Sequence, residues 1–382
     1  MSEVKKYGYI DALRGLAIMQ VVLVHAAQRF ATPDGKAFFL STKAQYGVQL
    51  FFITSALTLF LSFQQRLAKD GGDTVKFFLI RRYFRIAPIY YLAIVFYSAM
   101  IVIKPLESFP NYIDPLIVVL SFLFLNSFSP GAINYVPPGG WSVAIEMVFY
   151  FMIPFLFSRI KSLKSSIIWF VAVLIITRLM NLGAGYIILH YTSLNYELHK
   201  IWFLYFWLPN QLPVFMLGIV LYHLLKRRFT FGPLLGYLII AGAVGVMLSA
   251  FYLLPYYGLQ EVIPEFLVVA VLFTVIIFVL SQTSLSLFEN RLTRFLGKLS
   301  FSMYLSHFII LDGLAFIIRR VVHLSWQWNI TILYVVAIAV SAGVSYVLYH
   351  KIELTGVRFG QKLIDKLSAS EHLKPTPADV VN

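Results

Sequence analysis

Two ionisable side chains in the first apolar run of the chain have types and a spacing that suit catalysis. Arg14 and His25 lie eleven residues apart, which is close to three turns of an α-helix. Both side chains therefore project from the same helix face, about 16 Å apart along the axis. A histidine can accept a proton from a hydroxyl group, and an arginine can bind an anionic ligand. The spacing predicts a site that joins a cationic group at one level of a helix to a general base at another.

Glu146 is the carboxylate that we expect to lie beside His25. It follows Trp141 by five residues in an apolar run that we expect to cross the membrane inward, so it should reach a similar depth. A carboxylate next to an imidazole fixes its tautomer and raises its basicity, which a general base for an alcohol nucleophile needs. His307 is expected nearer the cytoplasmic side, where a lone histidine more often hydrogen-bonds between helices.

The densest basic cluster of the chain ends in Arg81, Arg82 and Arg85. Arg82 and Arg85 are three residues apart, so on a helix both guanidinium groups can reach one ligand. Arginine presents a planar fork that matches phosphate oxygens, and the cluster therefore predicts a phosphate-binding site. The alternative is that it only sets membrane topology and anchors lipid headgroups.

The composition requires a bilayer around these residues. Hydrophobic residues make up 59% of the 382 and charged residues only 13%, which excludes an ordinary soluble protein. The chain has no cysteine, so disulfides, thiolate nucleophiles and cysteine-bound metals are excluded. The net charge of +14 comes from short Lys and Arg clusters between apolar runs, a pattern typical of membrane orientation rather than of nucleic-acid binding.

Ten apolar runs are long enough to cross about 30 Å of hydrocarbon as helices. We place them near 9–28, 46–64, 86–104, 141–158, 167–188, 207–225, 232–254, 262–281, 300–319 and 329–350. A further run at 114–128 either crosses or is re-entrant. If it does not cross, every second loop is basic, as cytoplasmic loops are. We therefore expect an all-α, multi-pass protein of the cytoplasmic (inner) membrane, surrounded by lipids, with both termini cytoplasmic.

The spans form one predicted domain, 1–356, followed by a short cytoplasmic tail, 357–382. An ionisable group inside a span costs at least about 2.5 kcal/mol to insert, so each one indicates either function or a structural pair between helices. The spans contain such groups at Asp11, Arg14, His25, Glu146, Arg178, His307 and Asp312.

Several segments together resemble the membrane-bound acyltransferase-3 family, and the resemblance spans roughly 8–353. They are YIDALRGLA at 9–17, with Arg14 followed after ten residues by His25, GVQLFFITS at 47–55, Arg82-Tyr-Phe-Arg85 with Pro88, WSVAIEMVFY at 141–150 and GKLSFSMYLSH at 297–307. The chain departs from the family pattern at Gln49, at Ala56 and after Glu353, where Leu-Thr replaces Arg-Pro. None of these departures removes a candidate catalytic group.

The resemblance implies an enzyme that moves an acyl group, most often acetyl, from acyl-CoA to a hydroxyl of a cell-envelope polysaccharide such as an O-antigen or exopolysaccharide. Acyl-CoA would be a co-substrate, with no permanently bound cofactor and no metal. Catalysis is assigned to His25, Glu146 and Arg14, and donor binding to Arg82, Arg85 and Arg14. Acceptor binding is assigned to Trp141, Ser142, His307 and Asp11.

A proton-coupled transporter is the competing interpretation, because intramembrane His, Glu, Asp and Arg also form proton relays. Transporters of that kind usually contain internal repeats with broken helices, and we find no such symmetry in the sequence. The expected partners are acyl-CoA, a glycan or lipid-linked glycan, and membrane lipids, but not nucleic acid. The modified hydroxyl, the acyl chain length and the oligomeric state are left open.

Overall fold

The computed structural model describes residues 8–30, 35, 41, 43–103, 112–191, 202–227, 229–322 and 324–372, and these residues form α-helices and turns without a strand. The helices are α2 (Gly8–Phe30), α4 (Gly47–Asp70), α5 (Thr74–Ile103), α6 (Pro115–Phe122), α7 (Gly140–Arg159), α8 (Leu163–Tyr191), α10 (Phe203–Phe206), α11 (Leu208–Leu224), α12 (Pro233–Tyr256), α13 (Glu265–Gln282), α14 (Arg291–Val321), α15 (Trp326–Leu348) and α16 (Leu354–His372). This confirms the predicted all-α membrane protein.

Nine continuous helical stretches of the described residues are long and apolar enough to cross a membrane. Three of them contain more than one helix: Lys43–Ile103 contains α4 and α5, Phe203–Leu224 contains the short α10 and α11, and Trp326–Ala369 contains α15 and the more polar α16. The rings of Phe63 and Phe78 lie 5.2 Å apart. Fifteen residues would separate them by about 22 Å along a single helix, so the chain reverses direction between α4 and α5. Gly71, with φ of +53°, lies at this reversal. The described residues therefore contain ten helices of spanning length, in agreement with the ten predicted runs.

The uncertain run at 114–128 does not form a spanning helix. Its helix α6 has eight residues, about 12 Å, against about 30 Å of hydrocarbon. Asp114 caps its first turn by accepting a hydrogen bond from the backbone of Leu116 at 2.9 Å. A turn and the 3₁₀ helix Asn126–Phe128 then lead to α7. Of the two predicted alternatives, this geometry favours the one in which the segment does not cross.

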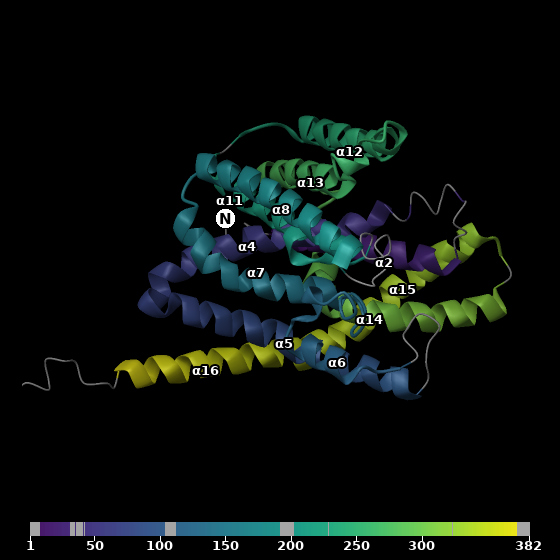
Figure 1. Ribbon diagram of the computed structural model, residues 1–382, viewed down its shortest axis with the longest axis horizontal. Helices are drawn as coiled ribbons and strands as arrows, with labels where there is room; N and C mark the ends of the chain where they lie inside the picture. Colours follow the sequence, from purple (N-terminus) through teal and green to yellow (C-terminus); the bar gives the residue numbers. More distant parts are fainter. Residues whose placement is uncertain are drawn as a thin grey trace, which may run out of the picture.

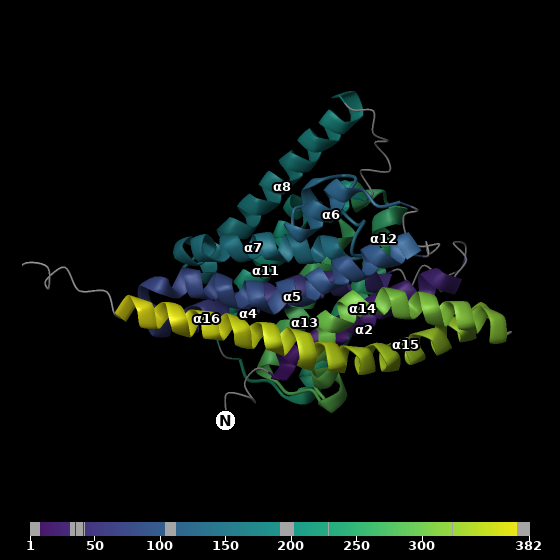
Figure 2. The same cartoon turned by 90° about the horizontal axis from the view of Figure 1, so that it is seen from below.

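Helix α2 lies inside the bundle and packs against α14, α4 and α15 (Figure 1). Helix α11 packs against both α4 and α8, and α12 packs against α13 at one edge of the bundle. Figure 2 shows α8 running obliquely away from the other helices. Little of α8 is buried, so most of its apolar surface is available to lipid.

Helices α2 and α14 cross in direct backbone contact. A Cβ atom on Gly297 would lie 1.7 Å from the carbonyl oxygen of Asp11, and one on Gly15 would lie 2.0 Å from that of Thr293. Small residues at such a crossing let two helix backbones touch, which is how membrane helices associate without a hydrophobic driving force. Gly218 does the same for α11 against α4, where its neighbour is Ala56.

Helix α16 extends α15 through a π-helical turn, Tyr349–Glu353, and packs along α5. Gly356 and Gly360 face Phe84, so the two helices approach closely there. The predicted boundary between domain and tail at 356 thus lies within a continuous helix that ends at His372.

Gly297→Ala should destabilise the protein because its methyl group has no room against the α2 backbone. Overpacking of this kind costs about 1 to 3 kcal/mol. Gly313, on the same helix, has open space around it, so Gly313→Ala is the matched control and should be neutral or slightly stabilising. Thermal unfolding of the purified proteins in detergent compares the two. Equal midpoints for both variants would show that the crossing is looser than described.

The sidedness of α7 can be tested because the natural chain contains no cysteine. Ala132 is fully buried, whereas its neighbour Gly131 is exposed with no other atom near its Cβ position. We predict that Gly131→Cys reacts with an impermeant maleimide in intact cells. Lys161→Cys, exposed beyond the other end of α7, should react only after permeabilisation. The reverse result would invert the orientation.

Candidate active site

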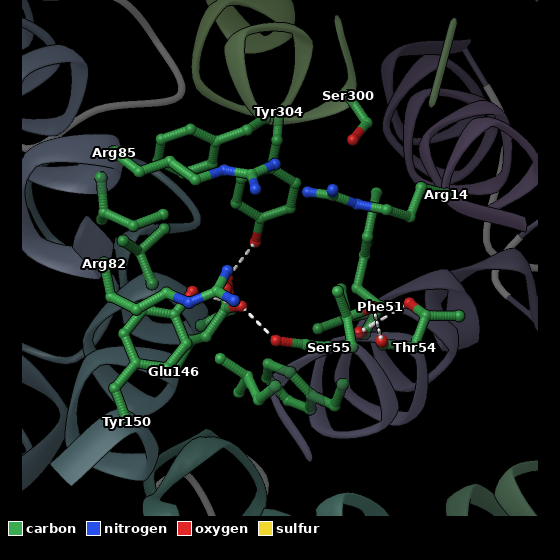
Figure 3. A pocket seen from close by; sticks show the side chains of 18 residues that line it. Arg14, Phe51, Thr54, Ser55, Arg82, Arg85, Glu146, Tyr150, Ser300 and Tyr304 are labelled. Atoms are coloured by element: carbon green, nitrogen blue, oxygen red, sulfur yellow. Dashed lines mark hydrogen bonds between the residues drawn. The ribbon is translucent and has the colours of Figure 1, made fainter. Parts of the chain in front are cut away.

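Two cavities lie next to each other inside the bundle. We call the first the arginine cavity; it has an empty volume of about 720 Å³, and its polar lining includes Arg14, Ser55, Arg82, Arg85, Ser142, Glu146, Tyr150, Ser300 and Tyr304 (Figure 3). We call the second the histidine cavity; its empty volume is about 1140 Å³, and its lining includes His25, Gln28, Arg29, Gln45, Gln49, Asn134, Trp141, Trp202, Tyr205 and Phe206. Arg14 and His25, which share one helix, therefore belong to different cavities.

The arginine cavity carries an excess of positive charge in its lining, because three guanidinium groups face one carboxylate. Arg82 lies over the rings of Phe78, at 5.5 Å, and Tyr150, at 6.0 Å. These aromatic faces hold the cation where its fork points toward the cavity. Behind the lining, the buried Glu353 interacts electrostatically with Arg85 and Arg14. The cavity is thus suited to a ligand with more than one negative charge.

Glu146 is fixed by two hydroxyl donors. Ser55 of α4 donates to Oε1, and Tyr150, one turn further along α7, donates to the same oxygen at 2.8 Å. The carboxylate also attracts the guanidinium groups of Arg14 and Arg82 across the cavity. Glu146 therefore connects α4 and α7 and helps to hold the arginines in place.

The expected contact between Glu146 and His25 is wrong. Trp141, at the start of α7, lines the histidine cavity, and five further residues of helix carry Glu146 about 7.5 Å deeper, into the arginine cavity. The prediction placed both groups at one depth because it took Trp141 to lie at the end of a straight span. Glu146 instead lines the same cavity as Arg14.

His25 is positioned to act as a base. Its Nδ1 atom lies 2.9 Å from Oε1 of Gln28. Because an amide oxygen can only accept a hydrogen bond, this contact favours the tautomer with the proton on Nδ1 and a lone pair on Nε2. The ring packs against Phe308, with centroids 4.4 Å apart. The tautomer that a general base requires is thus set by an amide three residues along the same helix, and no carboxylate is needed.

His307 lies beside His25, with ring centroids 5.3 Å apart, so the expected difference in depth between the two histidines is wrong. Its Nδ1 donates to backbone carbonyl oxygens of its own helix, Tyr304 at 2.7 Å and Met303 at 3.2 Å. The side chain is fully buried, its Nε2 has no hydrogen-bond partner, and it lines neither cavity. The structure thus places His307 behind His25, away from both cavities.

The other predicted acceptor residues are divided between the cavities. Trp141 lines the histidine cavity, and Ser142 lines the arginine cavity at its boundary with the other. Asp11 lies in the first turn of α2 and lines neither cavity. A carboxylate in that position stabilises the positive end of the helix dipole.

Val48 and Tyr304 line both cavities and so mark their junction. The Tyr304 hydroxyl accepts a hydrogen bond from Ser142 at 2.8 Å and lies 3.0 Å from the carbonyl oxygen of Gly139, to which it donates. The sequence offered Tyr304 only as part of a motif and gave it no role. Its place three residues before His307, one turn along α14, was the signal available.

Arg29 lines the histidine cavity, and two further arginines, Arg319 and Arg320, lie in the last turn of α14. Arg29 forms an ion pair with Asp312 of α14 at 2.7 Å, and Arg319 donates to the backbone oxygen of Arg29 at 2.7 Å. Arg320 lies 3.9 Å from the centre of the Phe316 ring. The contacts of Arg29 tie the end of α2 to α14, apart from the arginines of the other cavity.

The profile of a family described as an acyltransferase domain matches residues 7–350. Acyltransferase MdmB of Streptomyces mycarofaciens is 24% identical over 330 residues, which cover 79% of this chain and 78% of that protein. Protein 2 in the picA locus of Rhizobium radiobacter is 28% identical over 159 residues, covering 38% of this chain and 78% of that protein. No solved structure matches.

Proposed function

This chain belongs to the acyltransferase-3 family and is a multi-pass membrane acyltransferase, and from this premise we propose that it transfers an acetyl or similar acyl group from acyl-CoA to a hydroxyl of a cell-envelope or exported polysaccharide. The family match favours this activity over proton-coupled transport. One observation carries the proposal: a cationic cavity and a cavity containing a histidine base meet at a single junction.

The arginine cavity would hold the donor. Coenzyme A carries several phosphate charges, and Arg14, Arg82 and Arg85 supply forked donors to such groups from two different helices. Glu146 acts as a positioning residue here, because its carboxylate attracts Arg14 and Arg82 and is itself held by Ser55. In the proposed orientation, this cavity opens toward the cytoplasm of a cell whose inner membrane contains the enzyme.

The histidine cavity would hold the acceptor. Its amide side chains, Gln28, Gln49 and Asn134, can bond to sugar hydroxyls, and the ring faces of Trp141 and Trp202 offer stacking surfaces for a pyranose. This combination suits a neutral or weakly charged carbohydrate, either free or linked to a lipid. The class of acceptor we propose is an O-antigen or exopolysaccharide that reaches the outer face of the inner membrane.

In the proposed reaction the acceptor hydroxyl attacks the thioester carbonyl carbon while Nε2 of His25 takes its proton. The tetrahedral intermediate collapses with loss of the coenzyme A thiolate, which receives that proton from His25. One C–S bond breaks, one C–O bond forms, and the products are an ester and free coenzyme A. Gln28 keeps the proton of Nδ1 in place throughout.

His25→Ala should abolish acylation. Among the side chains that line the histidine cavity, no other one can replace His25 as the base that takes the proton of the acceptor hydroxyl. Loss of general-base catalysis typically reduces the rate by about 10² to 10⁴. The readout is the O-acyl content of envelope polysaccharides, by mass spectrometry, in cells that depend on the variant. His190→Ala, exposed on α8, is the control and should retain activity. Normal acylation by His25→Ala at normal abundance would contradict the assignment.

Arg82→Ala combined with Arg85→Ala should raise the apparent KM for acetyl-CoA at least about 100-fold, since two charge-assisted hydrogen bonds are worth about 3 kcal/mol or more. The KM for the acceptor should change little. The double Lys variant keeps both charges and the topology signal but loses the forks, so its KM should be intermediate. If the double Ala variant keeps the normal donor KM, the cluster only sets topology.

A further inference from the structure

The thioester carbon must lie where the two cavities meet, if the donor occupies one and the attacking hydroxyl the other. This step rests on the proposed function. Val48 and Tyr304 line both cavities, and of these two only Tyr304 has a polar group. Its hydroxyl, on a side chain that is 7% exposed, lies between Ser142 and the backbone of Gly139. The junction therefore contains a hydrogen-bond donor in a place that excludes most water.

The Tyr304 hydroxyl belongs to a triangle of three oxygens that holds two protons. Tyr304 lies 3.0 Å from the Gly139 carbonyl oxygen, Ser142 lies 3.1 Å from the same oxygen, and the two hydroxyls lie 2.8 Å apart. The carbonyl can accept from either hydroxyl. Ser142 can therefore keep the carbonyl satisfied while the Tyr304 proton turns toward another acceptor, so that turn leaves no buried polar group unpaired.

The triangle is held rigidly before any ligand enters. Gly139 has a φ of +74°, and a Cβ atom there would lie 2.9 Å from the Tyr304 hydroxyl, so the close approach requires glycine. The backbone N–H of Gly139 donates to Asn134 at 2.8 Å, which fixes the turn from its other side. Donors that are oriented in advance in a dry site stabilise developing charge far better than mobile ones.

We propose that Tyr304 is a catalytic residue whose hydroxyl donates a hydrogen bond to the thioester carbonyl oxygen and stabilises the oxyanion of the tetrahedral intermediate. Negative charge appears on that oxygen when the acceptor hydroxyl adds. It passes to the coenzyme A sulfur when the C–S bond breaks. Tyr304 keeps its proton throughout; its O–H group turns from the Gly139 carbonyl oxygen to the oxyanion. Ser142 takes over the bond to Gly139 during the step.

The test compares two Tyr→Phe variants that alter the same turn. Tyr304→Phe removes the junction hydroxyl. Tyr90→Phe removes a buried hydroxyl that contacts the adjacent carbonyl oxygen of Gly140, at 3.5 Å, but lines neither cavity. Both proteins are assayed in detergent with acetyl-CoA as donor and polysaccharide from acetylation-deficient cells as acceptor, by release of free thiol. Binding of coenzyme A itself is measured separately by thermal shift.

Tyr304→Phe should lower kcat about 10²- to 10³-fold, the usual effect of removing one oxyanion donor, with the KM for acetyl-CoA and the coenzyme A shift unchanged. Tyr90→Phe should stay within about threefold of the natural protein, because a hydroxyl outside the cavities contributes nothing to charge stabilisation. Ser142→Ala leaves the Tyr304 proton in place and should lose activity by an intermediate factor.

Equal losses in the two Phe variants would overturn the proposal, since they would show that the turn only needs both hydroxyls for its shape. An unchanged kcat in Tyr304→Phe would overturn it as well. If Tyr304→Phe fails to fold, Ser142→Ala decides: a fully active Ser142→Ala protein refutes the triangle. The proposed function fails differently, because the natural protein itself would then neither release thiol from acetyl-CoA nor be stabilised by coenzyme A.

Discussion

The direct contact between the backbones of α2 and α14 is the constraint on which the site depends. Because Gly15 and Gly297 have no side chains, the two helices touch, and everything that follows along each helix is brought into register. Along α2 come Arg14 and, about three turns later, His25. Along α14 come Tyr304, between the cavities, and His307, against the ring of His25. A wider crossing would move His307 away from the ring of His25.

The charged side chains that line the two cavities belong to two separate groups, each with its own compensation. On one side, Arg14 and Arg82 face Glu146, with Glu353 behind them; on the other, Arg29 pairs with Asp312. Since an uncompensated charge at bilayer depth is costly, each group stabilises the helices that contribute to it. The junction is made of Val48 and Tyr304, and Glu146 interacts electrostatically with this tyrosine. The Tyr304 hydroxyl is thus a neutral donor at the edge of the first charged group, at the place where the proposed reaction creates an anion.

The sequence predicted the helices well and the cavities only in part. Spans follow from local hydropathy, so they could be inferred without tertiary knowledge. Whether 114–128 crosses was left open, because its apolar run does not reveal that the helix has only eight residues. Glu146 was placed with the wrong partner although α7 begins at Gly140, within one residue of the predicted start. The level of that start relative to α2 depends on how the two helices pack, which span length does not reveal. Tyr304 was overlooked because a neutral tyrosine costs little to bury. Only its position between two cavities distinguishes it from a packing residue.

The separation of the cavities also follows from the problem that the proposed reaction poses. Coenzyme A cannot cross a bilayer, and neither can a polysaccharide, so the two substrates must meet within the protein without opening a continuous aqueous path. A junction filled by Val48 and Tyr304 keeps the cavities apart when empty. It would need to admit only a thioester and one hydroxyl when occupied. A small acyl group fits this arrangement better than a long one, because Phe51, whose ring lies 6.3 Å from that of Tyr304, and Phe52 line the same end of the arginine cavity. The side chains that seal the membrane would then also limit the length of the acyl chain that is transferred.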